Sequence, residues 1–334
     1  MKILILLINL FTFVLSFQPK VKGIFKPSLK MNWNILPIDL KSLSRNWFIT
    51  RSKLAGIPWD LYVNKRSNET SMTILNNFKE ELENISIEYP SYYTKPFHGY
   101  ENGNLQWDAA IEGEAATISI STNYWKNIDP YISEKWLRNN ITLNLENYIE
   151  YHDGLRLNDL INKNTKILDV GCSIGISTEY LKKEFDISNV EGLDLSPYFL
   201  SIAKMRSNEN NLDINYFHAN AENIPREDGY YDLITCNFLF HEVPNDITKK
   251  ILKELKRILS TNGILMITDL DKDILKDKLE KNNFNKWAFE ITEPHIYDYY
   301  TTEMFELLTE AGFSFINKVS NDPLNSSWLA KKWG

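Results

Sequence analysis

The segment ILDVGCSIGIS, residues 167–177, constrains the fold of this chain more than any other. Its first part, 167–170, is a short and largely apolar run, which is typical of a parallel strand buried on both faces. Its second part contains Gly171 and Gly175 and leads into hydroxyl and acidic side chains that favour the start of a helix. A strand that turns through glycines into a helix exposes backbone N–H groups, because no Cβ keeps a ligand away. We therefore expect a compact polar group of a ligand to bind at this turn.

The pattern of strand, turn and helix continues from this segment to the end of the chain. Strand-like segments occur at 166–170, 190–193, 214–218, 231–236, 263–268, 313–319 and 328–332, with helical segments at 178–185, 197–208, 247–259 and 302–311. Such alternation predicts an α/β fold, a doubly wound and mostly parallel sheet of seven strands with right-handed crossovers. No helix separates the last two strands, so we expect an antiparallel hairpin at the sheet edge.

Residues 33–152 form a different region, which is mainly helical and rich in aromatic side chains. Many Tyr, Pro and Gly residues between 89 and 107 predict an irregular connection. Two helices are expected after it, at 107–118 with small residues that allow close packing and at 133–151 with Ser133 as N-cap. Two interpretations of this region stay open: a support for the domain at 155–334, or a lid whose aromatic side chains line a substrate cavity.

The first residues have the composition of a targeting leader. Residues 1–16 combine Lys2 with a short apolar stretch, which is typical of a signal peptide and too short for a membrane span. Residues 17–32 contain several lysines and no acidic residue, as expected of a transit peptide. The pair resembles the two-part leader of algae with secondary plastids, which implies import into the plastid. Plain secretion or a membrane anchor are the alternatives, and no stable membrane span is expected in the mature chain.

Composition narrows the possible partners. The chain has 37 basic against 44 acidic residues and a formal net charge of -7, which argues against a protein that neutralises nucleic-acid phosphates. Its two cysteines, Cys172 and Cys236, lie in apolar surroundings and indicate buried thiols rather than a disulfide. The 5 histidines show no metal-ligand spacing, so we predict no metal site.

The carboxyl ends of the first strands carry side chains that suit a nucleoside ligand. In an open α/β sheet ligands bind at this edge. Asp194 follows Asp169 by 25 residues, near the separation at which an acid accepts hydrogen bonds from ribose hydroxyls. After the third strand, Asn220 and Ala221 can contact an adenine edge, and Asn237 ends the fourth strand. The GxxxG spacing of the glycine turn does not fit the dinucleotide fingerprint GxGxxG, which disfavours an NAD domain.

Together with Asp194, the segments HANAEN, YYDLITCNFLFHEVP and LKRILSTNGILMITD follow the glycine turn in order. Over residues 155–334 the chain resembles the class I S-adenosylmethionine-dependent methyltransferases, in particular the ubiquinone and menaquinone biosynthesis branch. GIPW, YTKPFH and LDLSPYFL are also similar to a plant and cyanobacterial group of such proteins. The resemblance implies a Rossmann-like methyltransferase fold and S-adenosyl-L-methionine as cofactor.

The resemblance also implies roles for individual residues. The methionine part of the cofactor would lie at the turn, which contains Asp169, Gly171, Cys172, Ser173 and Gly175. Asp194 would bind the ribose, and Leu195, Asn220 and Ala221 would contact the adenine. Asn237 would lie under the sulfonium, at the end of the fourth strand. Two positions depart from the family pattern. Ser173 replaces the middle glycine, where it either bonds the cofactor carboxylate or is tolerated in the turn. Asn220 replaces an acid and keeps an acceptor without the charge.

His241 and Glu242 are the candidate catalytic residues. They follow the fourth strand, beside the expected methyl site, and either could deprotonate an acceptor hydroxyl or acidic carbon. The alternative is that both only stabilise the loop before Pro244. His295, with tyrosines after it, either closes over the substrate or serves packing.

The acceptor is narrowed by motifs that the chain lacks. CNFL at the fourth strand differs from the Asn/Asp-Pro-Pro-aromatic turn that presents an exocyclic amine, and no Pro-Cys nucleophile occurs. These absences favour a small molecule, and the aromatic-rich N-terminal region and the plastid-type leader suit a hydrophobic or aromatic acceptor, such as a quinone, phenolic or isoprenoid-derived compound. An RNA or protein methyltransferase, or a non-catalytic cofactor-binding protein, is the alternative. The oligomeric state is not determined by these patterns.

Overall fold

A computed structural model describes residues 38–125, 127–185, 189–281, 286, 289, 290 and 292–333. The signal-peptide-like segment 1–16 and the possible transit peptide 17–32 lie outside the described residues. From Leu36 onward the chain packs as one unit.

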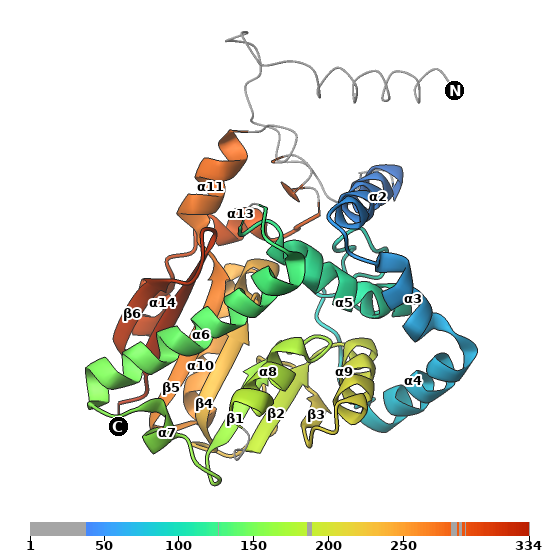
Figure 1. Cartoon of the computed structure of the whole chain (residues 1–334). Helices are drawn as coiled ribbons and strands as arrows, with labels where there is room; N and C mark the ends of the chain where they lie inside the picture. Colours follow the sequence, from blue (N-terminus) through green and yellow to red (C-terminus); the bar gives the residue numbers. More distant parts are fainter. Residues whose placement is uncertain are drawn as a thin grey trace, which may run out of the picture. The chain divides into compact units, whose positions relative to one another are not determined.

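The described strands form one seven-stranded sheet in the order β3-β2-β1-β4-β5-β7-β6 (Figure 1). β7 pairs antiparallel with both β5 and β6, and the other neighbours pair in parallel. The predicted doubly wound, mostly parallel sheet and its edge hairpin are therefore confirmed. The strands are β1 (Lys166–Val170), β2 (Asn189–Asp194), β3 (Asn215–His218), β4 (Tyr231–Asn237), β5 (Leu259–Leu270), β6 (Ser314–Ser320) and β7 (Asn325–Lys331).

Helices cover both faces of the sheet because successive strand side chains point to opposite sides. Ile167 packs in one apolar cluster with Leu145 of α6 and Leu181 of α8. Its neighbour Leu168 belongs to a second cluster that contains Leu255 of α10. The helices after β1 are α8 (Ile176–Glu184), α9 (Pro197–Glu209), η2 (Phe240–Glu242), α10 (Asn245–Ile258), α11 (Lys272–Glu280), α13 (Ile296–Tyr299) and α14 (Met304–Glu310).

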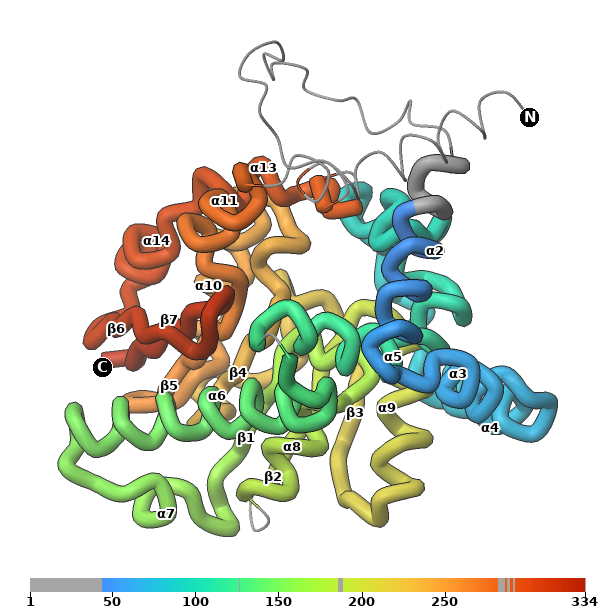
Figure 2. Tube along the Cα trace, turned by 45° about the horizontal axis from the view of Figure 1, so that its top comes forward, coloured from blue at the N-terminus to red at the C-terminus, as the bar shows by residue number. Residues whose placement is uncertain are grey.

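The helices before β1 pack directly on the sheet and its helices. Both views place α4 beside α9 and lay the long helix α6 across the strands (Figures 1 and 2). In this respect the N-terminal region supports the sheet, which is one of its two predicted roles. These helices are α2 (Ile38–Leu54), α3 (Trp59–Ser67), α4 (Glu69–Leu82), α5 (Trp107–Ser121), α6 (Pro130–Asp153) and α7 (Leu157–Leu160).

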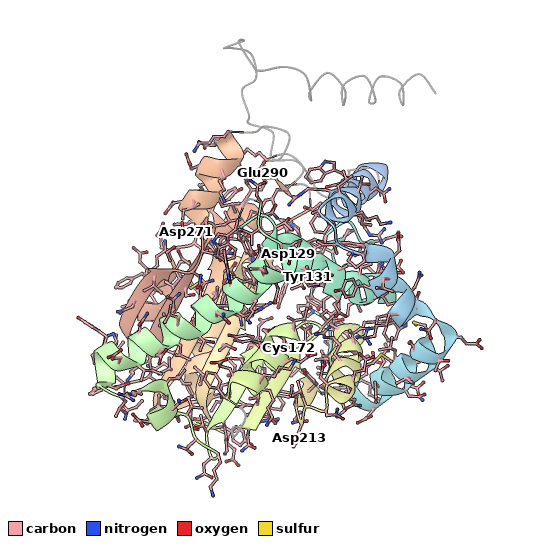
Figure 3. The ribbon with its side chains drawn as sticks, viewed as in Figure 1. Asp129, Tyr131, Cys172, Asp213, Asp271 and Glu290 are labelled. Carbon is pink, nitrogen blue, oxygen red and sulfur yellow. The ribbon has the colours of Figure 1, made fainter. Side chains whose placement is uncertain are left out.

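The start of α6 corrects one prediction from the sequence. The N-cap is Asp129, not Ser133, and Pro130 occupies the first helical position (Figure 3). The Asp129 carboxylate accepts hydrogen bonds from the backbone N–H groups of Tyr131 and Ile132, at 2.9 and 3.2 Å. Since an acid followed by proline is a stronger start signal than a serine further on, the helix begins one turn earlier.

The glycine turn after β1 packs against α5 without space for extra atoms. A Cβ built on Gly113 of α5 would lie 3.1 Å from Cγ2 of Ile174. The small residue therefore lets the helix approach the turn, as expected from the small side chains at 107–118. α5 thus holds the turn from the side opposite to β3.

Gly175, at the end of the same turn, packs closely against β3 and α9. Its φ is +79°, and a Cβ there would lie 2.5 Å from the Tyr216 hydroxyl oxygen and 2.9 Å from Cβ of Ala203. A side chain at position 175 would therefore collide with β3 and α9. The Tyr216 hydroxyl is buried and has no hydrogen-bond partner among the residues that the structure describes, so its removal is expected to cost little.

Gly175→Ala is expected to lower the free energy of unfolding by about 2 kcal/mol or more, because overpacking adds to a left-handed backbone. Gly56→Ala is the matched control, since Gly56 has φ +88° but no atom within 4 Å of a built Cβ. Adding Tyr216→Phe to Gly175→Ala should recover part of the loss. Urea denaturation measures all three. Equal destabilisation by Gly175→Ala and Gly56→Ala would contradict the packing argument.

Candidate functional site

The turn after β1 adopts a left-handed backbone at three residues. Gly171, Ser173 and Gly175 have φ values of 70°, 50° and 79°. Ser173 thus takes the conformation expected of the glycine that it replaces, which a side chain adopts at an energetic cost. Its backbone N–H donates to Oδ2 of Asp194 at 2.8 Å. The turn is therefore fixed by β2 as well as by β1.

Asp169 organises the turn from beneath. Its carboxylate is fully buried and accepts hydrogen bonds from the hydroxyls of Ser177 and Thr178 on α8 and of Thr235 on β4, at 2.5, 2.7 and 3.0 Å. The Asn237 side-chain N–H donates to it at 3.4 Å. Burial raises the pKa of Asp169, and the hydroxyl donors oppose that rise. Asp169 therefore positions its neighbours and does not reach the cavity described below.

Asp194 ends β2 and faces the cavity. Its Oδ1 accepts the backbone N–H of Ser196 at 2.8 Å, while Oδ2 accepts that of Ser173. Burial raises its pKa to about 6, although these backbone donors lower it. The carboxylate oxygens still have lone pairs for hydroxyl groups of a ligand.

The carboxyl ends of the strands open into one cavity of about 780 Å³. The expected cofactor residues that line it are Gly171, Cys172, Ser173, Asp194, Leu195, Asn220, Ala221 and Asn237, and the expected catalytic residues His241 and Glu242 line it too. Asp169 and Gly175 do not. Asp169 lies beneath the turn, and Gly175 faces Tyr216. The structure thus brings most of the expected residues together and gives these two a supporting position.

The other wall of the cavity comes from the region before β1. Aromatic and polar side chains of α2, α3, α5 and the segment between α4 and α5 complete it, among them Phe48, Trp59, Tyr92, Tyr93, Phe97, His98, Tyr100, Asn104 and Glu112. This wall agrees with the predicted lid. The N-terminal region therefore both supports the sheet and encloses the cavity.

Hydrogen bonds attach this wall to the sheet domain. The Tyr92 hydroxyl donates to Glu222 at 2.8 Å, and the Ser196 hydroxyl donates to the backbone oxygen of Asn104 at 2.6 Å. The backbone N–H of His98 donates to the carbonyl of Thr292 at 3.2 Å. The irregular segment therefore lies closed over the strand ends.

His241 forms a buried pair with Asp269 at the end of β5. Their Nδ1 and Oδ1 atoms are 2.7 Å apart, and the other oxygen of Asp269 accepts the backbone N–H groups of Phe240 and His241. Burial by itself would lower the pKa of His241, but Asp269, aided by two glutamates, raises it to about 9. At neutral pH His241 is therefore a cation.

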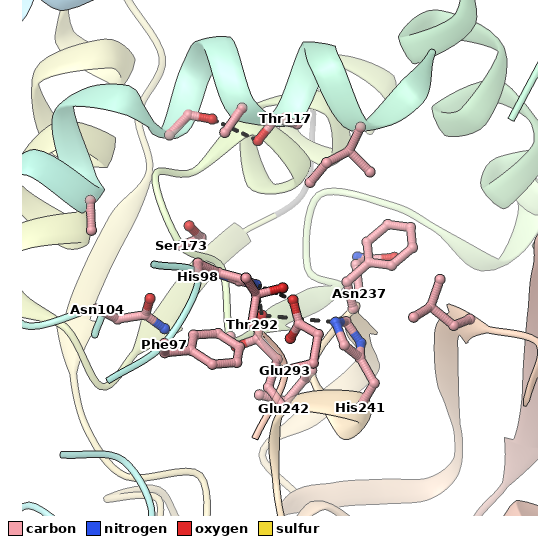
Figure 4. Close-up of a pocket in the computed structure, with 18 of the residues that line it drawn as sticks. Phe97, His98, Asn104, Thr117, Ser173, Asn237, His241, Glu242, Thr292 and Glu293 are labelled. Carbon is pink, nitrogen blue, oxygen red and sulfur yellow. Dashed lines mark hydrogen bonds and ion pairs between the residues drawn. The ribbon is translucent and has the colours of Figure 1, made fainter. Parts of the chain in front are cut away.

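Two carboxylates lie between His241 and His98 (Figure 4). Nε2 of His98 is 3.0 Å from Oε1 of Glu293 and 3.9 Å from Oε1 of Glu242, and Nε2 of His241 is 4.0 Å from the same Glu242 oxygen. Burial raises the pKa of Glu242 to about 7, while both histidines oppose the rise. A group that titrates near neutrality and faces a cavity suits proton transfer.

Sequence reasoning did not assign His98, Asp269 or Glu293 to the site. His98 lies in the YTKPFH segment, which is similar to a plant and cyanobacterial group of methyltransferases but contains no recognisable catalytic pattern. Asp269 ends the strand segment ILMITD, so its place at a strand's carboxyl end was a usable signal. Glu293 follows no strand, and only the folded chain brings it to His98. His295 contacts Tyr92 edge-on at 6.3 Å and lines the same cavity.

Three further observations apply to the described residues alone. No group of three or more His, Cys, Asp or Glu side chains is placed there to hold a metal ion. Cys172 and Cys236 are buried free thiols, as expected. No helix in that part of the chain combines the length and the apolar character that a membrane crossing requires.

Comparisons with known proteins concern the same part of the chain. A family model described as a methyltransferase domain matches residues 168–267. The chain is 28% identical over 195 residues to the ubiquinone/menaquinone biosynthesis C-methyltransferase of Campylobacter jejuni, which covers 52% of this chain and 80% of that enzyme. It is 30% identical to the ubiquinone biosynthesis O-methyltransferase of Colwellia psychrerythraea over an alignment of 132 residues, and this alignment covers 38% of this chain. That alignment spans 52% of the O-methyltransferase, about half its length.

A solved structure was also found. The crystal structure of a putative S-adenosyl-L-methionine-dependent methyltransferase from Methanococcus maripaludis is 19% identical and covers 75% of this chain and 98% of that one, with a TM-score of 0.44. Because this score is low, the fold assignment rests on the strand order of the sheet itself.

Asp194→Ala is expected to abolish measurable binding of S-adenosylmethionine in calorimetry, since each hydroxyl bond to a carboxylate contributes about 1.5–3 kcal/mol. It should also lower the melting temperature, because two backbone N–H groups lose their acceptor. In the unchanged protein the affinity should fall as the pH is lowered through about 6, where Asp194 takes up a proton.

Asp232→Ala is the matched control. Asp232 accepts the backbone N–H of Lys166 and the hydroxyl of Ser260 at the other end of the sheet, away from the cavity. Its loss should alter stability and leave binding unchanged. Unaltered affinity in Asp194→Ala would refute the assignment of this carboxylate to the cofactor.

Proposed function

Because the chain belongs to the class I S-adenosylmethionine-dependent methyltransferases, we propose that it transfers the cofactor's methyl group to a small acceptor of hydrophobic or aromatic character. The single observation that carries this proposal is the enclosed cavity at the strand ends. One wall has the groups for the cofactor, and the other is built from aromatic side chains. The two parts of one cavity thus suit two ligands that react with each other.

The residues present fit the cofactor. Asp194 offers acceptors for ribose hydroxyls, and the turn at Gly171 has no Cβ that would block the methionine part. Asn237 is oriented by Asp169 at the floor of the cavity. The carboxylates of Asp194 and Glu242 also suit a positively charged ligand. When bound, S-adenosylmethionine supplies an electrophilic methyl group on its sulfonium sulfur.

The acceptor class is supported by the enclosing wall. Phe48, Trp59, Phe97 and Tyr124 contribute flat apolar surface to the cavity. The net charge of -7 and the buried position of the site favour a small molecule over a nucleic acid. The two relatives named above are methyltransferases of ubiquinone or menaquinone biosynthesis. A quinone, phenolic or isoprenoid-derived acceptor agrees with all three observations.

Glu242 is the better proton acceptor of the two candidate catalytic residues. His241 is paired with Asp269 and stays protonated at neutral pH, whereas the pKa of Glu242 is about 7. A base is most effective when its pKa lies near the operating pH. We assign proton acceptance to Glu242 and a charge-stabilising part to His241.

For localisation we propose the plastid of a secondary-plastid alga, with the secretory pathway as the alternative. The support is the lysine-containing, acid-free segment that follows the signal-peptide-like start. Mass spectrometry of the mature N-terminus is expected to find the chain cut after residue 16 or within the segment that follows. An intact Met1 would oppose the proposal.

The function is tested by incubating the protein with methyl-labelled S-adenosylmethionine and plastid extract. We expect one labelled small molecule, which forms about 10²- to 10⁴-fold more slowly with Glu242→Gln at the same protein concentration. Its formation should be unchanged with the control Glu310→Gln, since Glu310 is an exposed residue at the end of α14. Label in RNA or protein would support the alternative activities. Cofactor binding without any labelled product would favour a non-catalytic binding protein.

The pH dependence follows from the two titrating groups. With the purified acceptor, kcat/KM should rise with pH through about 7, as Glu242 loses its proton, and fall above about 9, as His241 becomes neutral. Glu242→Gln should lower kcat about 10²- to 10⁴-fold and remove the rising limb. A rising limb that persists in Glu242→Gln would show that another group accepts the proton.

A further inference from the structure

His98 reaches the site from outside the part of the chain that the family model matches. It lies in the irregular segment between α4 and α5, whereas the match covers residues 168–267. Its side chain is 39% exposed and lines the cavity beside Glu242. The contact between them therefore exists only because the N-terminal region folds over the strand ends.

Glu242 has two histidines at similar distances from one of its carboxylate oxygens. Nε2 of His98 and Nε2 of His241 lie 3.9 and 4.0 Å from the same oxygen, Oε1 of Glu242. Each histidine is in turn held by a carboxylate, His98 by Glu293 at 3.0 Å and His241 by Asp269 at 2.7 Å. Two histidine–carboxylate pairs thus enclose one glutamate that faces the cavity.

The charges that face Glu242 determine how readily it holds a proton. His98 and His241 favour its ionised form, while Glu293, Asp194 and burial oppose it. Tyr93, which is half-buried, also lies close enough to Glu242 to interact with its charge. Because an opposite charge within about 4–6 Å lowers a carboxyl pKa by about 1–3 units, each histidine has a measurable share in the balance.

We propose that His98, held by Glu293, is a positioning residue that keeps Glu242 available as proton acceptor, and that the acceptor substrate carries a dissociable proton, as phenols and enols do. The inference rests on the proposed function and names the substrate class of the same site. Tertiary amines and thioethers have no proton to lose and make no use of such a cluster.

The proton step balances without a further reactant. The acceptor's hydroxyl proton moves to a carboxylate oxygen of Glu242, and its electron pair stays on the acceptor. In methylation at oxygen, a lone pair of that oxygen forms the new bond to the methyl carbon. In methylation at a conjugated carbon, the carbon–carbon π pair forms that bond while the oxygen pair makes a carbonyl. The pair of the broken sulfur–carbon bond remains with the sulfur, which becomes neutral.

The test follows Glu242 directly in the cofactor-free protein. With 13C-labelled glutamate side chains, the carboxyl signal that disappears in Glu242→Gln is titrated by NMR. The midpoint is expected near pH 7 in the unchanged chain. His98→Gln should raise it by about one pH unit, because the histidine that favours the ionised form of Glu242 is lost, and His98→Lys should bring it back down.

His152→Gln is the matched control. His152 lies on α6, where its ring contacts Tyr148 and Phe315. This change should leave the Glu242 titration where it was. An unchanged midpoint in His98→Gln, or one that shifts equally in His152→Gln, would overturn the positioning role.

Two further measurements test the positioning role with a second variant and the substrate class from the product. If His98→Gln does not fold, Glu293→Gln is used, and the pKa of His98 measured by histidine NMR should fall, since Glu293 is what raises it. A labelled product methylated on a tertiary amine or thioether would overturn the substrate class. The titrations need no acceptor, so a shift without any labelled product would count against the proposed function and not against the cluster.

Discussion

The buried carboxylate of Asp169 is the interaction on which the site depends. It has no exposed surface, and hydroxyls of α8 and β4 together with the amide of Asn237 donate to it. A carboxyl group without such partners would be expensive to bury. The bonds join the first strand, the helix after it and the fourth strand at one point. The backbone of the turn and the direction of Asn237 follow from that junction.

The cavity is a product of two regions that the sequence keeps apart. A small residue allows the contact, since Gly113 lets α5 reach Ile174, while within the sheet domain Gly175 leaves space for Tyr216 and Ala203. The same approach places the aromatic wall opposite Asp194. A sheet with open strand ends therefore becomes an enclosed site, where water is displaced and charges act on each other more strongly.

In the cluster of His98, His241, Glu242, Asp269 and Glu293, burial and ion pairing give chemically similar side chains different pKa values. Asp269 raises the pKa of His241 to about 9, and Glu293 raises the pKa of His98. Among the described residues, the two histidines lie 3.9 and 4.0 Å from Glu242, farther than these partners lie from each other, so burial dominates and its pKa rises to about 7. Of these carboxylates, the one that titrates near neutral pH is the one best suited to accept a proton from a substrate.

The sequence by itself determined the positions of the strands, the glycine turn and the acids at the strand ends, because these follow from local patterns of apolar residues and turn residues. It placed Asp194 and Asn237 at the cavity for the same reason. It misplaced the N-cap of α6, where a proline next to Asp129 outweighed Ser133, and it could not assign Gly175 to packing against Tyr216. The meeting of His98, Glu242 and Glu293 was decided only by the tertiary structure, since their contacts join segments far apart in the chain and no local pattern encodes such a distance.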